Sequence, residues 1–512
     1  MQNDSEDPVV SVSDGGASRR ARAVMVLGTS SGAGKSWLAT ALCRWYARQG
    51  LSVAPFKAQN MSNNARVVAA AGAGAPAGEI GSAQYFQALA ARAVPDVRMN
   101  PLLLKPERDT HSQVVLLGRV DAALGATPWR GRSVRVWPVV TAALDALMRE
   151  NDVVVIEGAG SPAEINLSDV DIVNMRVAEH ATAACLLVTD IDRGGAFAHL
   201  YGTWALLPPT QRGLLRGFVL NKFRGDAALL DPGPRLLQQR TGVPTVATLP
   251  MWREHGLPEE DGIFDERAVA AAGEVRLRVA VVAFPHISNL DEFAPLRNVP
   301  GLSLHWVRTP SQIDGWGARD WIILPGSKST SADLAWLRRQ GLDRAVAAHA
   351  QRGAPVLGIC AGLQMLGEAM IDPHGIDGNG PGLGLLPLVT TFAQDKTVVV
   401  QTRASFGTVR GVWQPLSGLE VRGYEIHHGR SAEHPAMAAA GRHGHPVMGS
   451  GLAWQDDAGN VLGVYLHGLF EDGAVMQALF GVHTPTLDAV FDGLADHAER
   501  HFDAGVLASL VH

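Results

Sequence analysis

The segment over residues 355–367, PVLGICAGLQMLG, places a cysteine between a short apolar run and the start of an expected helix. Cys360 is flanked by Gly358 and Gly362, the G-x-C-x-G spacing of a sharp strand-to-helix turn that has no room for side chains beside a nucleophile. Such a turn predicts a thiol that projects from a sheet near a helix N-terminus, where a thiolate and an oxyanion are favoured. The alternative is a small buried cysteine on a core strand, because free cysteine is commonly buried.

A histidine in the same half of the chain suits the chemistry of this cysteine. His467 ends the apolar run over residues 461–466, and a glycine follows it. A lone histidine at such a place is more often structural, but beside a cysteine on a strand-to-helix turn it becomes the expected general base. His427 is a weaker second candidate for the base. A polar turn over residues 325–330 follows another buried run of this half.

The N-terminal half begins with a pattern that binds phosphate groups. An apolar run over residues 23–27 leads into GTSSGAGKS, residues 28–36, and then into an expected helix with one apolar face. This is the context of a P-loop, in which backbone N–H groups surround the phosphates, a lysine reaches the outer ones and a hydroxyl meets Mg²⁺. The G-x-x-x-x-G-K pattern would start at a threonine here, so the loop is a variant with its glycine one position earlier. The residues expected at ATP are Thr29, Gly32, Gly34, Lys35 and Ser36.

Polar residues follow the later apolar runs of the N-terminal half. Glu157 follows the run over residues 152–156, and an acid at the carboxyl end of a strand facing a P-loop commonly supplies a second Mg²⁺ contact. Asn221 follows the run over residues 217–220, where an amide either contacts a nucleotide base or caps a loop. We therefore expect Ser36 and Glu157 at the metal and Asn221 at ATP.

An amide-rich stretch over residues 57–64 is a candidate site for the acceptor substrate. It follows a second strand, at the edge where open parallel sheets bind ligands, although a solvated turn has a similar composition. Lys105, which precedes a proline, fits a carboxylate clamp and a surface lysine equally well. The residues expected at the acceptor are Lys57, Gln59 and Asn60.

The alternation of apolar strands and helical stretches favours an α/β fold with two doubly wound domains. Residues 23–251 form the expected P-loop domain, and residues 276–506 form the second domain. A charged segment interrupted by proline and glycine, residues 252–275, is the expected linker. Residues 1–22 are polar without periodicity and are expected to be a disordered tail.

Composition narrows the classes of protein to be considered. The chain has 512 residues, of which 46% are hydrophobic and 18% are charged, so it is globular with more than one core. A net charge of −6 gives no electrostatic reason to expect nucleic acid or an anionic membrane as partner. No apolar run reaches the roughly 18 residues of a membrane span, and no signal pattern begins the chain. Three widely spaced cysteines fit a reducing cytoplasm better than a disulfide framework.

The joint order of the motifs resembles the cobyric acid synthases, glutamine-hydrolysing enzymes of cobalamin biosynthesis. The C-terminal half, with GICAGLQ, resembles class I (triad-type) glutamine amidotransferases, and the N-terminal half resembles dethiobiotin-synthetase-like ATPases. The resemblance implies a P-loop NTPase-type domain followed by a flavodoxin-like amidotransferase domain. The motifs that carry it are FKAQNMSNN, EGAGSPAEINL, TDIDRGGAF, LPGSKST and YLHGLF.

The resemblance also implies roles for residues of the second domain. Cys360 would attack the glutamine amide while His467 takes and returns the proton. The typical His-x-Glu of the amidotransferases reads His467-Gly-Leu469 here, so the third triad member is missing at its usual place. Either the site works as a Cys–His pair or the orienting group comes from elsewhere. The backbone N–H groups implied at the oxyanion belong to Gly326, Ser327 and Ala361.

The implied reaction is activation of a carboxylate followed by amide formation. ATP phosphorylates a substrate carboxylate, and ammonia from glutamine displaces the phosphate. The implied acceptor is a corrinoid, adenosylcobyrinic acid a,c-diamide, amidated at its b, d, e and g carboxylates, with Mg²⁺ assisting ATP. Free ammonia is mostly ammonium at neutral pH, so we expect a path between the domains that keeps it unprotonated.

Two other functions are compatible with parts of the sequence. Cobyrinic acid a,c-diamide synthases share the two-domain plan, but their acceptor loop contains Asp and Tyr, unlike the amide-rich stretch over residues 57–64. Partition-type P-loop ATPases, which act as dimerising switches, would leave Cys360 and His467 unexplained. The sequence makes no prediction of the oligomeric state.

Overall fold

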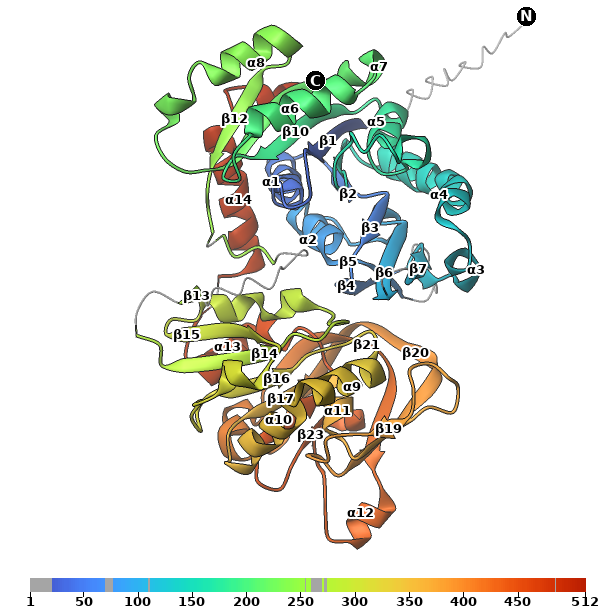
Figure 1. Cartoon of the computed structure of the whole chain (residues 1–512), viewed down its shortest axis with the longest axis vertical. Helices are drawn as coiled ribbons and strands as arrows, with labels where there is room; N and C mark the ends of the chain where they lie inside the picture. Colours follow the sequence, from blue (N-terminus) through green and yellow to red (C-terminus); the bar gives the residue numbers. More distant parts are fainter. Residues whose placement is uncertain are drawn as a thin grey trace, which may run out of the picture.

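The computed structural model describes residues 21–69, 77–108, 111–253, 255–258, 269–270, 274–483 and 485–512. These residues form two α/β units that are stacked along the long axis of the molecule (Figure 1). The predicted fold class, two domains built on parallel sheets, is confirmed. The predicted tail lies outside the described residues as far as residue 20, and so does much of the predicted linker.

Six parallel strands make the sheet of the N-terminal unit. The strand that precedes the P-loop lies inside this sheet, where its apolar residues are buried on both faces. Because the chain runs to one side of this strand and later to the other, the loops after its neighbours meet at one edge, where open sheets bind ligands. The order is β12 (Thr245–Pro250), β11 (Leu215–Phe223), β10 (Ala184–Asp190), β1 (Arg22–Gly28), β9 (Val153–Glu157) and β2 (Val53–Phe56).

Helices cover both faces of this sheet. Val24 and Val26 of β1 face the helix α1 (Lys35–Arg48), whereas Met25 and Leu27 face the side that is covered by α4 (Trp129–Glu150). Among the described helices, none is long and apolar enough to cross a membrane. The other helices of the unit are α2 (Ser82–Ala90), α3 (Ala122–Gly125), α5 (Met175–Ala181), α6 (Ala196–Leu206), α7 (Pro209–Arg212) and α8 (Gly233–Thr241).

The chain between β2 and β9 adds two small sheets on the side that faces the second unit (Figure 1). The sequence analysis did not predict them, because their apolar residues are mixed with charged and amide residues in no clear periodic pattern. One sheet has the order β3 (Gln59–Met61), β6 (Leu102–Arg108), β7 (His111–Leu116) and β8 (Arg119–Val120). The other pairs β4 (Ala65–Val68) with β5 (Gly78–Gly81).

An eight-stranded sheet forms the core of the second unit. Its five central strands are parallel, and they include every buried run that the sequence analysis assigned to this domain. The strand that leads to Cys360 lies between two parallel neighbours. The order is β13 (Val269–Ala270), β15 (Leu302–Val307), β14 (Leu277–Val282), β16 (Trp321–Leu324), β17 (Val356–Ile359), β24 (Val461–Val464), β23 (Ala453–Gln455) and β22 (His445–Met448).

A second sheet of this unit contains a long hairpin that reaches towards the N-terminal unit (Figure 1). Its strands have the order β19 (Gly380–Pro381), β18 (Ala369–Ile371), β20 (Leu388–Ser405) and β21 (Glu420–Glu433). The helices of the unit are α9 (Thr330–Gln340), α10 (Leu342–Gln351), α11 (Ala361–Leu366), α12 (Pro435–Ala439) and α13 (Gly473–Phe480).

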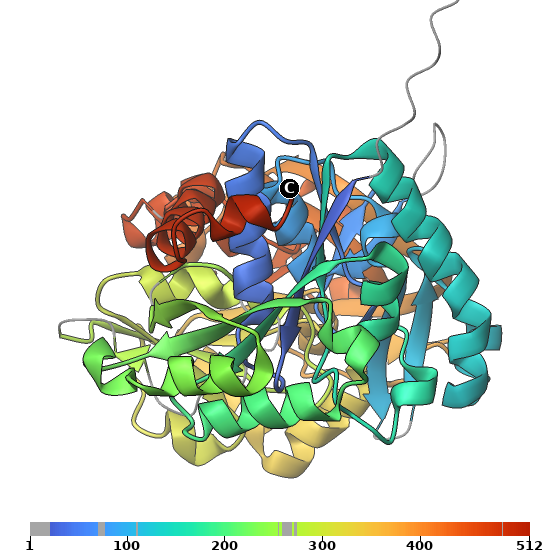
Figure 2. The same ribbon diagram turned by 90° about the horizontal axis from the view of Figure 1, so that it is seen from above.

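The end of the chain returns to the N-terminal unit. Helix α14 (Leu487–His501) packs beside α1, and α15 (Val506–Ser509) follows it, as Figures 1 and 2 both show. The Arg44 guanidinium donates to Asp492 over 2.8 Å, and the Tyr46 hydroxyl donates to the Leu507 carbonyl over 2.9 Å. The packing of α14 differs from the expected domain range of 276–506, because an amphipathic helix does not show in its sequence which sheet it covers.

Replacement of Phe491 tests whether the packing of α14 against α1 stabilises the N-terminal unit. Its side chain is buried in the same apolar cluster as Leu38 and Leu42 of α1. Phe491→Ala should lower the free energy of unfolding by about 3 to 5 kcal/mol, through lost burial and a cavity. Urea denaturation measures the change. The control Leu229→Ala, at a side chain that is 82% exposed, should change it by less than about 0.5 kcal/mol. Equal effects of the two substitutions would contradict the packing of α14.

Candidate active site

Cys360 lies at the sharp turn between β17 and α11 that the sequence predicts. Its backbone has φ of +53° and ψ of −105°, a conformation that residues other than glycine rarely adopt and that is common where a side chain must be presented. A Cβ at Gly362 would lie 1.8 Å from the Leu324 carbonyl oxygen, so this close approach of the backbone requires glycine. The Cys360 N–H donates to the Val464 carbonyl over 2.7 Å, which ties the turn to the next strand.

His467 stands between Cys360 and a carboxylate. The charge of Cys360 acts on it, and its Nδ1 lies 3.2 Å from Glu292 Oε1. Burial lowers the pKa of His467, but the negative charges of Glu292 and Cys360 outweigh burial and raise this pKa to about 10. The protonated imidazole can therefore stabilise a negative sulfur atom. His427, the weaker candidate, has its Nδ1 within 2.8 Å of the Gly429 carbonyl oxygen instead.

Glu292 is the orienting group that the sequence analysis left open. It lies in the 3₁₀ segment Leu290–Asn298, 175 residues before His467, and it is fully buried. Its Oε2 also accepts a hydrogen bond of 3.1 Å from the Gly468 N–H, which fixes the carboxylate against the histidine. The only sequence signal was a pair of acids next to Phe293 after a buried strand, and this signal is too common to single out a site.

The three residues expected at the oxyanion lie around Cys360 and His467. A Cβ at Gly326 would lie 3.0 Å from His467 Cε1, so this glycine packs directly against the imidazole. Ser327 is held by its side chain, whose hydroxyl donates to Asp333 over 2.6 Å. Ala361 is the first residue of α11. The arrangement brings these three residues together, and their role as donors stays a prediction.

In the Gly-rich loop after β1, the lysine side chain is hydrogen-bonded to nearby backbone carbonyls. Lys35 Nζ donates to the carbonyls of Ser30 and Gly160 over 3.0 and 3.1 Å. Gly34 has φ of +100°, and a Cβ there would lie 2.0 Å from Asn221 Nδ2. The Asn221 amide donates to the Ala33 carbonyl over 2.9 Å, so Asn221 supports the shape of the loop.

Two further contacts join the loop to the strand on its other side. The Thr29 hydroxyl donates to the Thr189 hydroxyl over 3.0 Å. Lys222 Nζ donates to the Gly32 carbonyl over 2.7 Å and lies 3.1 Å from Asp190 Oδ2. The sequence analysis gave no role to Lys222, because a lysine beside an asparagine at a strand end is not a specific signal.

Glu157 is the polar centre of the N-terminal site. Its Oε1 accepts hydrogen bonds of 2.8 Å from both the Ser36 hydroxyl and Lys57 Nζ, and its Oε2 accepts one of 2.6 Å from the Gln87 amide. Burial raises the pKa of Glu157, but the charge of Lys57 and these hydrogen bonds outweigh burial and lower it. The carboxylate is therefore ionised although it is 1% exposed.

The amide-rich stretch belongs to the same network. Lys57, Gln59 and Asn60 are all buried, which contradicts the alternative of a solvated turn. The Asn60 amide donates to Gln84 over 3.3 Å, and the Gln84 amide reaches Glu157 over 3.5 Å. Lys57 and Asn60, expected at the acceptor, and Ser36, expected at the metal, thus converge on the Glu157 carboxylate.

The donor atoms at this site fit a magnesium ion. Mg²⁺ prefers oxygen ligands and is commonly held by few protein oxygens together with substrate phosphates. Ser36 and Glu157 present a hydroxyl and a carboxylate next to the phosphate-binding loop. Within the described ranges, no group of three or more His, Cys, Asp or Glu side chains could hold a metal ion by itself.

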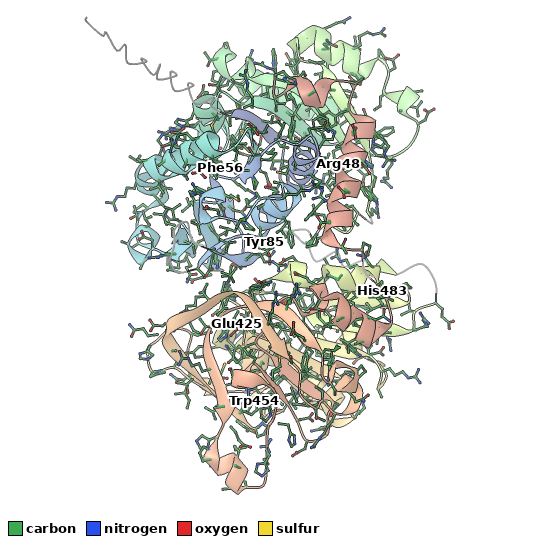
Figure 3. All side chains as sticks on the ribbon, turned by 180° about the vertical axis from the view of Figure 1, so that it is seen from behind. Arg48, Phe56, Tyr85, Glu425, Trp454 and His483 are labelled. Atoms are coloured by element: carbon green, nitrogen blue, oxygen red, sulfur yellow. The ribbon has the colours of Figure 1, made fainter. Side chains whose placement is uncertain are left out.

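A buried guanidinium joins the two units beside the cysteine site. Arg66 of β4 forms ion pairs with Asp291 and, over 2.5 Å, with Glu471. Its Cζ lies 5.6 Å from the ring centre of Tyr85 and 4.9 Å from that of Tyr424, which stacks on His467. Figure 3 shows Tyr85 at the end of the N-terminal unit that faces the second unit. The two candidate sites therefore meet one shared junction.

Substitution of Glu292 tests the charge balance at His467. Because the pKa of His467 is raised from 6.5 to about 10, its imidazolium stabilises the folded chain fully below pH 6.5, and this contribution is lost as the pH rises through about 10. Glu292→Gln should lower the pKa of His467. The folded chain should then lose less stability as the pH rises through about 10. NMR titration of His467 and urea unfolding at several pH values measure both effects. Glu425→Gln, which removes a carboxylate beside His427, is the control, and an unchanged pKa of His467 in Glu292→Gln would contradict the ion pair.

Each unit matches a described domain family. Residues 24–258 match the CobQ/CobB/MinD/ParA nucleotide binding domain, and residues 278–475 match the CobB/CobQ-like glutamine amidotransferase domain. Among solved structures, PurLQS from Thermotoga maritima aligns with a TM-score of 0.30 and 19% identity, covering 40% of this chain and 97% of that chain. The domain families, together with the curated relatives, carry the assignment.

Two curated relatives are similar over nearly their whole length. The cobyric acid synthase of Polaromonas naphthalenivorans (strain CJ2) is 72% identical over 491 residues, which cover 96% of this chain and 99% of the relative. The cobyric acid synthase of Variovorax paradoxus (strain S110) is 72% identical over 490 residues, with the same coverage. With its P-loop domain, its glutamine amidotransferase domain and these relatives, the chain belongs to the cobyric acid synthase family.

Proposed function

We propose that this chain makes cobyric acid by amidating the b, d, e and g carboxylates of adenosylcobyrinic acid a,c-diamide with ATP and glutamine. One observation carries the proposal: a chain similar to cobyric acid synthases over nearly its whole length has a Cys–His–Glu site and a P-loop site on the two sides of one buried junction. The same similarity favours this function over cobyrinic acid a,c-diamide synthesis and over a partition-type switch.

The cysteine site has the groups needed to release ammonia. The Cys360 sulfur forms a bond to the amide carbon of glutamine, and the carbon–nitrogen bond breaks as His467 returns a proton to the leaving nitrogen. Glu292 orients the imidazole and stabilises its charge. Water then hydrolyses the glutamyl thioester to glutamate. The backbone N–H groups of Gly326, Ser327 and Ala361 are the proposed oxyanion donors.

The P-loop site has the groups needed to activate a carboxylate. In this proposal, the Thr29–Ser36 loop and Lys35 bind the phosphates of ATP, and Asn221 keeps the loop in shape. Ser36 and Glu157 would hold Mg²⁺, which offsets phosphate charge when it is bound. The acceptor carboxylate takes the terminal phosphoryl group, and ammonia displaces phosphate to leave the amide.

The acceptor side of the site is the buried stretch next to Glu157. Lys57, Gln59 and Asn60 are proposed to position the corrinoid carboxylate, which is supported by the network that joins Lys57 and Asn60 to Glu157. A pocket of about 660 Å³ opens at the junction beside this stretch and is lined in part by Met61 and His286. Its mixed apolar and polar lining suits a corrinoid. The use of ATP and glutamine favours a cytoplasmic location, which is also part of this proposal.

Counting amides on the product tests the function directly. With ATP, Mg²⁺, glutamine and the diamide corrinoid, the parent protein should add an amide at each of the four carboxylates, seen as mass shifts. Cys360→Ala should form no amide from glutamine but should retain amidation with ammonium salts, because only the nitrogen source is lost. Equal glutamine hydrolysis by Cys360→Ala and the parent would disprove the role of the second domain.

Substitution of Lys35 should impair the P-loop site and leave the cysteine site active, which is the reverse of the effect expected for Cys360→Ala. Removal of a preorganised charge at the phosphates should lower ammonium-dependent amidation at least about 100-fold. Release of glutamate from glutamine should continue, since Lys35 belongs to the other unit. The measurement compares Lys35→Ala with Arg235→Ala, which removes a side chain that is 68% exposed on α8. Amidation by Lys35→Ala at the rate of this control would rule out the proposed ATP site.

A further inference from the structure

Lysine is rare in this chain, and its positions follow the two candidate sites. The chain has 44 lysine and arginine residues, and only six of them are lysines. Three of the six contact the P-loop site. The other three gather at the junction between the units. Because arginine supplies almost every other cation, these junction positions point to a need for an amine. The junction lysines are Lys105, Lys328 and Lys396.

Two of the three amines contact one carboxylate, Glu79. Lys396 Nζ lies 2.5 Å from Glu79 Oε1, and Lys105 forms an ion pair with the other oxygen of Glu79. The charge of Lys328 acts on Lys105. Lys105 and Glu79 are fully buried, whereas the Lys396 side chain is 17% exposed. One carboxylate thus pairs with two amines, and a third amine acts on one of them, in a place that is largely removed from water. We name these four residues the lysine cluster.

The lysine cluster spans the junction. Lys105 and Glu79 come from β6 and β5 of the N-terminal unit. Lys396 comes from β20, and Lys328 follows Gly326 and Ser327 in the turn beside His467. Since Gly326 packs against His467, Lys328 lies within two residues of the cysteine site.

The other side of the lysine cluster leads to Glu157. Strand β6 pairs with β3, which carries Gln59 and Asn60, and β5 leads into α2, which carries Gln84 and Gln87. Within the part of the chain that the structure describes, three buried oxygens on β3 and α2 have no hydrogen-bond partner. Such acceptors suit a small molecule with N–H groups. The three oxygens are Gln59 Oε1, Ser82 Oγ and Gln87 Oε1.

We propose that the lysine cluster is the crossing through which ammonia released at Cys360 enters the N-terminal unit, and that its amines exclude ammonium there. The inference rests on the proposed function. An ammonium ion at the crossing would add a further cation beside three amines and one carboxylate, and such repulsion is strong away from water. Neutral ammonia meets no such barrier and can form hydrogen bonds with the amines and the buried oxygens.

The properties of lysine explain why arginine does not replace it here. A guanidinium is planar and larger, whereas the lysine amine is a compact group that leaves room for ammonia and can donate a hydrogen bond to it. Burial, with the charge of Lys396, lowers the pKa of Lys328 to about 7, and burial lowers that of Lys396 to about 8. Burial and the neighbouring amines also lower the pKa of Lys105. The other titratable groups that interact with the cluster are Glu107, His428 and Cys360.

An isotope competition tests the crossing. The parent and Lys105→Arg convert the diamide corrinoid with ATP, Mg²⁺ and glutamine labelled with heavy nitrogen in its amide, in the presence of excess unlabelled ammonium. The parent product should carry mainly heavy nitrogen. Lys105→Arg keeps a positive charge for Glu79 but blocks the crossing. Its ratio of heavy to light nitrogen should fall at least about tenfold, which corresponds to a barrier about 1.4 kcal/mol higher.

The same reactions distinguish a crossing from a structural ion pair. An ion pair alone would survive replacement by arginine, so a parental isotope ratio in both Lys105→Arg and Lys396→Arg would overturn the inference. A parent product with mainly light nitrogen would also overturn it. Ammonium-dependent amidation by each variant shows that its N-terminal unit is folded, and Arg403→Met, at an exposed position of β20, is the matched control with the parental ratio. A parent that forms no amide from either source would instead refute the proposed function.

Discussion

The buried guanidinium of Arg66 is the interaction on which the assembly of the two units depends. Removal of a cation from water costs several kcal/mol unless carboxylates are well placed around it, and both carboxylates here come from the second unit. One of them, Asp291, immediately precedes Glu292, so the ion pair that joins the units also holds the segment that orients His467. Closure of the junction and completion of the cysteine site are thus one structural event.

A second buried charge organises the N-terminal site. Glu157 accepts hydrogen bonds from the P-loop through Ser36 and from the amide-rich stretch through Lys57. Because these groups share one carboxylate as their hydrogen-bond partner, the groups proposed for phosphate, metal and acceptor cannot move apart independently. This explains how a terminal phosphoryl group and an acceptor carboxylate could be brought together by a small number of side chains.

The local motifs were predictable because each depends on neighbours in the chain. The strand, glycines and lysine of the P-loop are consecutive, and Cys360 lies between two glycines that the turn requires. The strand that leads to His467 was recognisable from its apolar run. In contrast, Asn221 was expected at the nucleotide, and the structure gives it a contact to the Ala33 carbonyl, which depends on the spacing of β11 from the P-loop.

The sequence by itself determined the two α/β domains, the P-loop, the cysteine turn and the candidate base, since these follow from the order of apolar runs, glycines and polar strand ends. Only the tertiary structure decided which distant groups meet them. Glu292 reaches His467 across 175 residues, α14 packs on α1 instead of the nearer sheet, and Lys396 meets Glu79 across the junction. Such contacts depend on strand order and on the burial of opposite charges, and neither leaves a pattern in the neighbouring sequence.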